Sequence, residues 1–208
     1  MQTDITAARE RFCTILRSTQ IDNIDDIINY LDELGFFDAP ASVRNHFNFA
    51  GGLLLHSLNV YDVAMRLRED MIAMRPDCEP MLQPESIAIA ALLHDVCKAD
   101  IYRQVKRKQK NEIGIWEEIQ TYDVDYSNLP AGHGEKSVMM LLRAGLDLED
   151  DELLAIRWHM APWDLATQSI EMDRSYRTAL KKTPLVSLIH NADSLAAHII
   201  ESDGFTLG

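Results

Sequence analysis

The stretch PESIAIAALLHDVCK, residues 84–98, decides the fold. Pro84 suits the first turn of a helix, because its missing N–H would have no partner there. The residues that follow are almost continuously apolar, which predicts a buried helix. The run ends on His94 and Asp95, and a buried carboxylate is very costly unless its charge is offset. A divalent cation is one suitable partner, since it binds both imidazole and carboxylate groups.

Two further segments carry ligand-type side chains on apolar helical faces. His56 lies on such a face in GGLLLHSLNV, and Asp193 lies on one in SLIHNADSLAAHI. Each feature has an ordinary alternative, because a histidine on an apolar face is commonly a core residue. The His94–Asp95 pair could likewise be a helix end that reaches solvent. Three helices that each direct one such group inward are nevertheless how metal sites are built in helical bundles.

Most of the remaining chain has the apolar spacing of helices. We expect helices over residues 4–18, 21–34, 51–73, 134–145, 149–159 and 167–181, and a last one from Pro184. Residues 103–126 alternate instead around Asn111 and Gly114, which predicts a β-hairpin. The predicted fold is therefore an all-α bundle, one domain over residues 1–208. Its N-terminal helices (1–43) pack on the core, and the hairpin is an insertion.

Composition narrows the function classes. The 208 residues carry a net charge of -13, which argues against general coating of nucleic acid but permits a nucleotide or a strand end at a metal. The three cysteines are scattered and form no CxxC zinc motif. The chain lacks a signal-peptide pattern and a bilayer-length apolar run, so we expect a cytoplasmic protein without membrane contact. Nothing in the sequence indicates an oligomeric state.

The ordered set of histidines and aspartates resembles the HD-domain superfamily of metal-dependent phosphohydrolases. The segments GGLLLHSLNV, ALLHDVCK and NADSLAA carry the resemblance, which covers about residues 44–200. The first metal ion implied by the resemblance has the ligands His56, His94, Asp95 and Asp193. A second ion would be held by His133 and His159, with Asp95 as the bridge. The adjacent His-His pair of cyclic-dinucleotide-hydrolysing relatives is missing, which speaks against cyclic di-GMP as substrate.

The resemblance implies an enzyme that hydrolyses a phosphomonoester or phosphodiester of a nucleotide or a nucleic-acid end. Two cations about 3.5–4 Å apart would clamp the phosphate and activate a water molecule. Mixed imidazole and carboxylate ligands suit Mn, Fe, Co, Ni or Zn. One alternative is a catalytically weak module that keeps the fold and metal and senses a nucleotide. A second is a helical interaction protein with coincidental histidines.

Several further side chains are candidates for the chemistry. Asp95 and Lys98 are the predicted catalytic groups, Lys98 neutralising a phosphate oxygen as charge develops. The alternative for Lys98 is a helix-end lysine that pairs with the helix dipole. Predicted substrate contacts, besides Lys98, are Lys136, Arg157 and His46. For five other residues we expect more ordinary roles. Cys97 should be a small buried residue, and His190 and His198 should lie in helix packing or at the surface. Trp158 and Trp163 should belong to the core or form an aromatic wall.

The predicted hairpin is locally basic in an acidic protein. Its first half contains Arg103, Lys106, Arg107, Lys108 and Lys110. The ordinary explanation is a solvated hairpin edge guarded by lysines against pairing with other strands. The functional alternative is a collar that contacts substrate phosphates, with Trp116 or Tyr122 stacking on a base.

Overall fold

The computed structural model describes residues 4–111, 113–161, 169–202 and 204. The helices are α1 (Ile5–Ser18), α2 (Ile24–Leu34), α3 (Gly52–Met74), α4 (Pro84–Leu93), α5 (Cys97–Ile101), α6 (His133–Arg143), α7 (Asp150–Trp158), α8 (Ile170–Lys182) and α9 (Leu185–Leu195). Short helical turns cover Phe36–Asp38, Pro76–Met81 and Ala196–Ile200, and the strands are β1 (Tyr102–Lys110) and β2 (Trp116–Val124). The predicted fold class, mostly helical with one inserted antiparallel hairpin, is confirmed.

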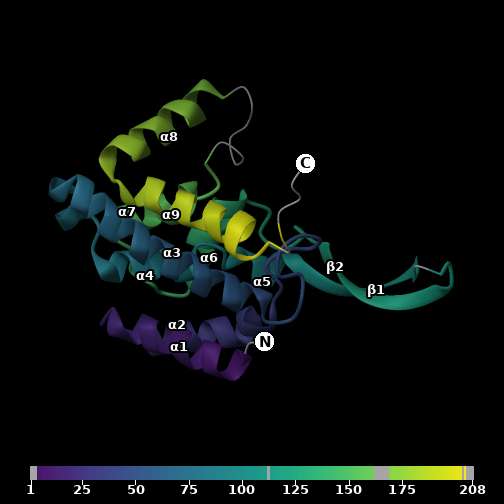
Figure 1. Ribbon diagram of the computed structural model, residues 1–208. Coiled ribbons are helices and arrows are strands. Elements are labelled where there is room, and N and C mark those ends of the chain that lie inside the picture. The colour runs from purple at the N-terminus through teal and green to yellow at the C-terminus, as the bar shows by residue number, and fades with distance from the viewer. Residues whose placement is uncertain (1–3, 112, 162–168, 203, 205–208) are drawn as a thin grey trace.

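Helix α4 lies at the centre of the bundle. Its residues from Ile87 to Leu93 are all buried, as their almost continuous apolar character requires. Helices α1, α3, α7 and α9 each pack against it. Figure 1 shows α1 and α2 on one side of these central helices and α8 on the opposite side. The residues that follow α4 consequently begin inside the molecule rather than at its surface.

The N-terminal helices are joined to the bundle by aromatic packing. Asp4 caps α1 by accepting hydrogen bonds from the backbone N–H groups of Thr6 and Ala7. The rings of Phe12, Phe36 and Phe37 contact one another with centroids 5.3–5.5 Å apart. Helix α1 packs against both α3 and α4. The organisation of residues 1–208 as one domain remains a prediction.

Helix α3 begins at the two glycines, as the sequence indicates. Gly51 has φ +84°, a left-handed conformation that favours glycine. A Cβ on Gly52 would lie 2.1 Å from the carbonyl oxygen of Phe47, so the preceding loop passes too close for any side chain. This close approach holds the loop that carries His46 against the start of α3.

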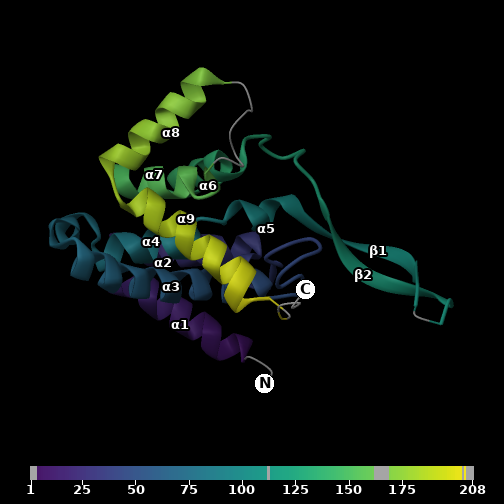
Figure 2. The same cartoon turned by 45° about the horizontal axis from the view of Figure 1, so that its top comes forward.

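The hairpin extends away from the helices in both ribbon views (Figures 1 and 2). Its register runs from Tyr102 opposite Val124 to Lys110 opposite Trp116. The turn is closed by Asn111, whose side chain accepts a hydrogen bond from the N–H of Ile115. Within the described residues, no helix is both long and apolar enough to cross a membrane.

Candidate metal centre

Five helices bring the predicted ligands to one buried region. His56 lies in α3, His94 and Asp95 directly follow α4, His133 begins α6, His159 directly follows α7, and Asp193 lies in α9. The side chains of His56, His94 and His159 are fully buried, and that of Asp95 is 2% exposed. His133 and Asp193 retain 16% and 18% exposure. The centre is therefore deep in the bundle but open on one side.

The first ligand cluster comprises His56, His94, Asp95 and Asp193. The Nε2 atom of His56 lies 3.2 Å from Asp193 Oδ1 and 3.5 Å from Asp95 Oδ2. The Nε2 atom of His94 lies 3.2 Å from the same Asp95 oxygen and 4.0 Å from Asp193 Oδ1. His56, His94 and Asp95 are close enough together to share one metal ion. The four ligand atoms thus converge from three segments that are far apart in the sequence.

The second ligand cluster comprises Asp95, His133 and His159, which are also close enough to share an ion. Here the other carboxylate oxygen is used, because Asp95 Oδ1 lies 2.5 Å from His133 Nε2 and 3.4 Å from His159 Nε2. Oδ2 faces the first cluster and Oδ1 faces the second. This orientation is the one required of a carboxylate that bridges two cations.

Hydrogen bonds on the far side of each ring set the histidine tautomers. His94 Nδ1 lies 2.8 Å from the Ala91 carbonyl oxygen, and His159 Nδ1 lies 2.7 Å from that of Ile156. A carbonyl only accepts, so Nδ1 carries the proton and Nε2 presents its lone pair. Within the described part of the chain, the buried Nε2 atoms of His56, His94 and His159 have no hydrogen-bond partner. Because such unpartnered buried atoms are rare, these residues fit a metal ion well.

The electrostatics of the first cluster also suit a cation. Burial raises the pKa of Asp95, but the neighbouring side chains of Lys98, His94 and His133 lower it by more, so this pKa lies well below its usual range. Burial likewise raises the pKa of Asp193, but His56, whose Nε2 lies 3.2 Å away, lowers it below its usual value. Both carboxylates are therefore ionised at neutral pH.

His56 and His159 differ in their protonation. Burial lowers the pKa of His56, but Asp193, Asp95 and Glu201 raise it well above its usual value. Burial lowers the pKa of His159, which therefore stays neutral. Without a metal ion, a proton on His56 balances the carboxylates, and binding of a cation at Nε2 would release that proton.

Comparison with known proteins agrees with this geometry. The model of the family described as HD domain matches residues 53–198. The chain belongs to the HD-domain family. This family is one of metal-dependent phosphohydrolases, and the matched range contains every predicted metal ligand. No curated protein and no solved structure gave a match. The resemblance seen in the sequence is thus confirmed at the level of the family.

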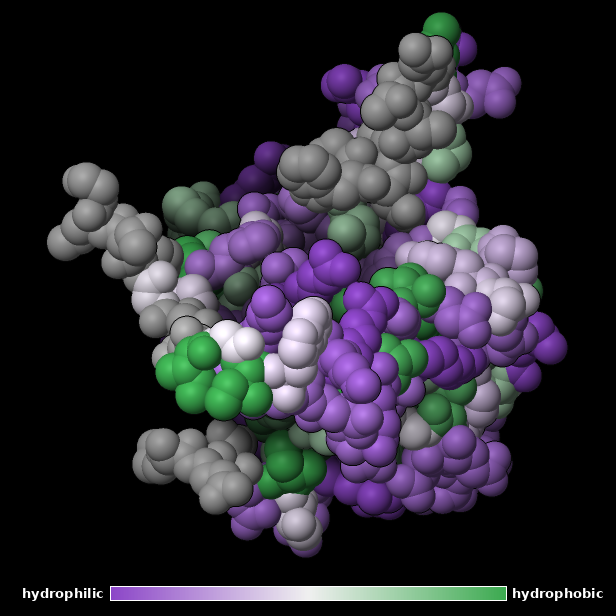
Figure 3. Space-filling view, turned by 90° about the vertical axis from the view of Figure 1, so that its right-hand side faces the viewer, coloured by the Kyte–Doolittle hydropathy of each residue, from purple (hydrophilic) through white to green (hydrophobic). Residues whose placement is uncertain are grey.

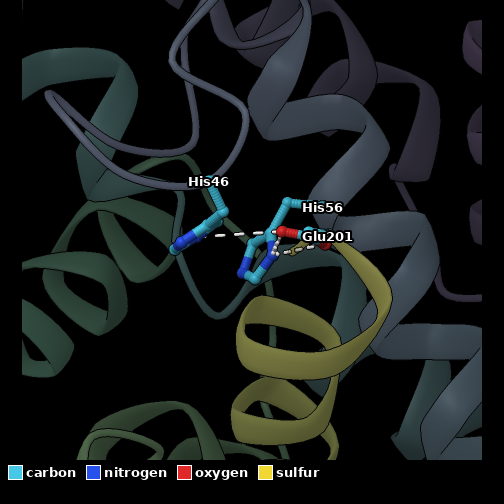
Figure 4. A group of neighbouring side chains, drawn as sticks. All are labelled: His46, His56 and Glu201. Carbon is cyan, nitrogen blue, oxygen red and sulfur yellow. Dashed lines mark hydrogen bonds and ion pairs between the residues drawn. The ribbon is translucent and has the colours of Figure 1, made fainter. Parts of the chain in front are cut away.

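Glu201 is a buried residue of the HD centre that the sequence interpretation missed. Its two carboxylate oxygens lie 3.0 and 3.1 Å from His56 Nδ1, and its Oε1 accepts a hydrogen bond of 3.0 Å from Asn59. Figure 4 shows Glu201 beside His56, with His46 on the other side of the His56 ring. Glu201 follows the largely apolar run AAHII, so the signal that singled out Asp95, an acid at the end of an apolar run, was also present here.

We expect Glu201→Leu to weaken metal binding about 10- to 100-fold, because it removes the acceptor that orients His56. Glu201→Gln should have a smaller effect, since the amide oxygen can still accept the Nδ1 proton. Competition titration against a chelator measures both affinities, and circular dichroism checks the fold. Unchanged affinity in Glu201→Leu would contradict an orienting role for this carboxylate.

A cavity of about 310 Å³ opens beside the two clusters. Lys98, His46, Tyr102 and two of the ligands, His133 and Asp193, are among its lining residues. The Nζ atom of Lys98 lies 2.5 Å from Asp95 Oδ2. The structure thus brings both Lys98 and His46, two of the predicted substrate contacts, to the mouth of the centre.

Three further histidines line the cavity. Burial, followed by the charges of His56 and Lys98, lowers the pKa of His46 to about 4, so this ring is neutral near pH 7. His190 and His198, expected in packing or at the surface, line the cavity as well. His190 Nδ1 also lies 2.6 Å from the carbonyl oxygen of His159.

The other two predicted phosphate contacts are engaged elsewhere. Lys136 is fully buried, and its Nζ lies 2.5 Å from Asp100 Oδ2. Arg157 binds Glu135 at 2.6 Å and stacks over the ring of Trp158. These cations serve the packing of α6 and α7, so their assignment as substrate contacts has no support in the structure. The partners of Lys136 and Arg157 are determined by tertiary contacts. Residue type and proximity in the sequence do not reveal these contacts.

Cys97 and Trp158 have ordinary places in the core. Cys97 is buried as expected, with its Sγ 3.4 Å from His133 Nδ1. Trp158 is buried and packs against Tyr176, which makes it a core residue. Trp163, the other candidate for the core or an aromatic wall, lies outside the described residues.

Proposed function

We propose that the protein is a phosphohydrolase with two metal ions, acting as a phosphomonoesterase or phosphodiesterase on a nucleotide or a nucleic-acid end. The orientation of Asp95 carries this proposal, because its two oxygens face two separate sets of histidines. The unpartnered Nε2 atoms support it independently. Bound divalent cations would supply Lewis-acid charge and an activated water molecule.

The chain's own residues would bind and orient the phosphate. Lys98 has three N–H donors and uses one on Asp95, which leaves donors for a phosphate oxygen in the cavity. The neutral ring of His46 can hydrogen-bond a substrate without adding charge. The depth of Asp95 and His159 keeps bulk water from the bottom of the centre, which strengthens each of these electrostatic contacts.

The proposal is tested by metal analysis followed by a phosphoester screen. Protein purified without chelator should contain about two transition-metal ions per chain. It should hydrolyse model phosphomonoesters or phosphodiesters and lose this activity when the metal is stripped. Absence of metal and of turnover after reconstitution with Mn, Fe, Co, Ni and Zn would contradict the enzyme and leave the helical interaction protein. About one ion per chain would reduce the centre to a mononuclear site.

We expect Lys98→Ala to lower turnover about 10²- to 10³-fold while the metal content stays unchanged. The reason is that Lys98 is placed to stabilise charge on the phosphate, whereas it is not among the metal ligands. Turnover and elemental analysis on the same preparation separate the two effects. Lys98→Arg, which keeps the charge, is the matched control and should retain more activity. Full turnover in Lys98→Ala would remove the catalytic role.

A further inference from the structure

The strand register sorts the charges of the hairpin onto two faces. Side chains alternate between the faces of a strand, and directly paired residues share a face. One face, here called the lysine face, consists of Tyr102, Gln104, Lys106, Lys108 and Lys110 from β1, with Trp116, Glu118, Gln120, Tyr122 and Val124 from β2. It carries three lysines against one glutamate, a net charge of +2 in a protein of -13.

The opposite face is electrically balanced. It carries Arg103 and Arg107 against Glu117 and Asp123. Arg107 forms an ion pair with Asp123 on this face. On the lysine face, by contrast, only Lys106 has a carboxylate partner among the described residues, Glu118 at 3.0 Å. Lys108 and Lys110 therefore remain available to an anion.

The lysine face also offers an aromatic surface near its outer end. Trp116 is 63% exposed, and Lys110 Nζ lies 5.3 Å from the centre of its ring. Figure 3 views the molecule from the side toward which the hairpin projects, and this side is mostly hydrophilic with small separate hydrophobic groups. An exposed tryptophan beside lysines can stack a base while the lysines neutralise phosphates.

The lysine face leads to the metal centre. Tyr102, its innermost residue, lines the same cavity as Lys98, His133 and Asp193. From there, the lysines follow at every second residue, which spaces them about 6.6 Å apart along the strand. This spacing is comparable to that of successive phosphates in an extended single strand. A base must be free of its own stacking partners before it can stack on Trp116, so an unpaired end is the form that fits.

We propose that the lysine face binds a single-stranded segment of nucleic acid whose end enters the metal centre. This inference rests on the proposed phosphohydrolase function and specifies its substrate as an oligonucleotide with an unpaired end. Charge complementarity comes from the three lysines, and base stacking comes from Trp116. The neutral opposite face takes no part.

The test compares two variants that each remove two positive charges. Lys108→Gln/Lys110→Gln alters the lysine face, and Arg103→Gln/Arg107→Gln alters the opposite face. Binding of the full chain to a labelled oligothymidylate is measured by fluorescence anisotropy over a range of salt concentrations, and a gel checks that the probe stays intact. The lysine variant should lower the salt slope of log Kd by about 1.4, since each phosphate contact contributes about 0.7 for a single strand. The arginine variant should leave the slope unchanged.

Stacking is tested separately with Trp116→Ala, which should weaken binding about 5- to 100-fold. An acidic polypeptide would not depend on this ring, so equal binding of polyglutamate would contradict a nucleic-acid partner. Equal or tighter binding of a duplex of the same sequence would contradict the single-strand assignment. Equal effects of the lysine and arginine variants would overturn the role of the lysine face.

Turnover of a small ester, bis(p-nitrophenyl) phosphate with Mn²⁺, distinguishes this inference from the proposed function. The ester is too small to reach the hairpin, so all three variants should hydrolyse it as the wild type does. Normal turnover without lysine-dependent binding would overturn the inference and leave the function intact. Lysine-dependent binding without turnover would support the lysine face and contradict the enzyme.

Discussion

Asp95→Asn should lose the metal ions of both clusters and lower turnover by more than about 100-fold, beyond the range typical of residues that only support a ligand. The amide keeps the size of the carboxylate but removes the charge that both cations would share. Elemental analysis gives the number of ions per chain, and turnover of a model phosphodiester gives the activity.

The neighbouring ligands provide matched controls for this result. Asp193→Asn should lose mainly the ion of the first cluster, because the Asp193 carboxylate lies 3.2 Å from His56 and 4.0 Å from His94. His133→Ala should lose only the ion of the second cluster. If Asp95→Asn lost no more metal than Asp193→Asn, Asp95 would not be a bridge between two ions.

The inward position of the ligands was predictable because apolar periodicity identifies the buried face of each helix. His56, Asp95 and Asp193 all lie where an apolar helix forces its polar group inside, and a buried group needs a partner. The same reasoning correctly placed the hairpin, since alternation and the Asn111 turn are local signals. Local pattern thus indicates which side chains are buried and which elements they belong to.

The partners of long polar side chains were not predictable from local pattern. Glu201 contacts His56 across 145 residues of sequence, and Arg157 binds Glu135. Such partners are set by how distant elements meet, which no local periodicity records. The charge on each face of the hairpin was not predictable for a related reason. It depends on which residues of the two strands pair, and a register shift of one residue would move every side chain of one strand to the other face.

The buried pair of Asp100 and Lys136 should dominate the stability of this part of the bundle. We expect Asp100→Asn to lower the free energy of unfolding by about 3–5 kcal/mol, because it leaves the Lys136 ammonium buried without a counter-charge. The two side chains are only 9% and 1% exposed. Urea unfolding of the metal-free protein measures the change without a contribution from metal binding.

Another aspartate–lysine pair serves as the control. Asp150 and Lys182 also form an ion pair, but their side chains are 80% and 49% exposed. Asp150→Asn should therefore cost at most about 1 kcal/mol. The double variant Asp100→Asn/Lys136→Met should recover much of the lost stability, since it removes the unpaired charge as well.

The pH dependence gives the same pair a second, independent signature. Burial raises the pKa of Asp100, but hydrogen bonds from Lys136 and Asn128 lower it more, so its pKa in the folded protein lies below the usual value. A depressed carboxyl pKa stabilises the fold fully above the unfolded-state pKa of about 3.9, and this contribution is lost as the pH falls through the folded value. The stability difference between wild type and Asp100→Asn should therefore be constant near neutral pH and shrink in acid. A difference that persisted unchanged into strong acid would mean that packing, and not the charge of Asp100, holds Lys136 in place.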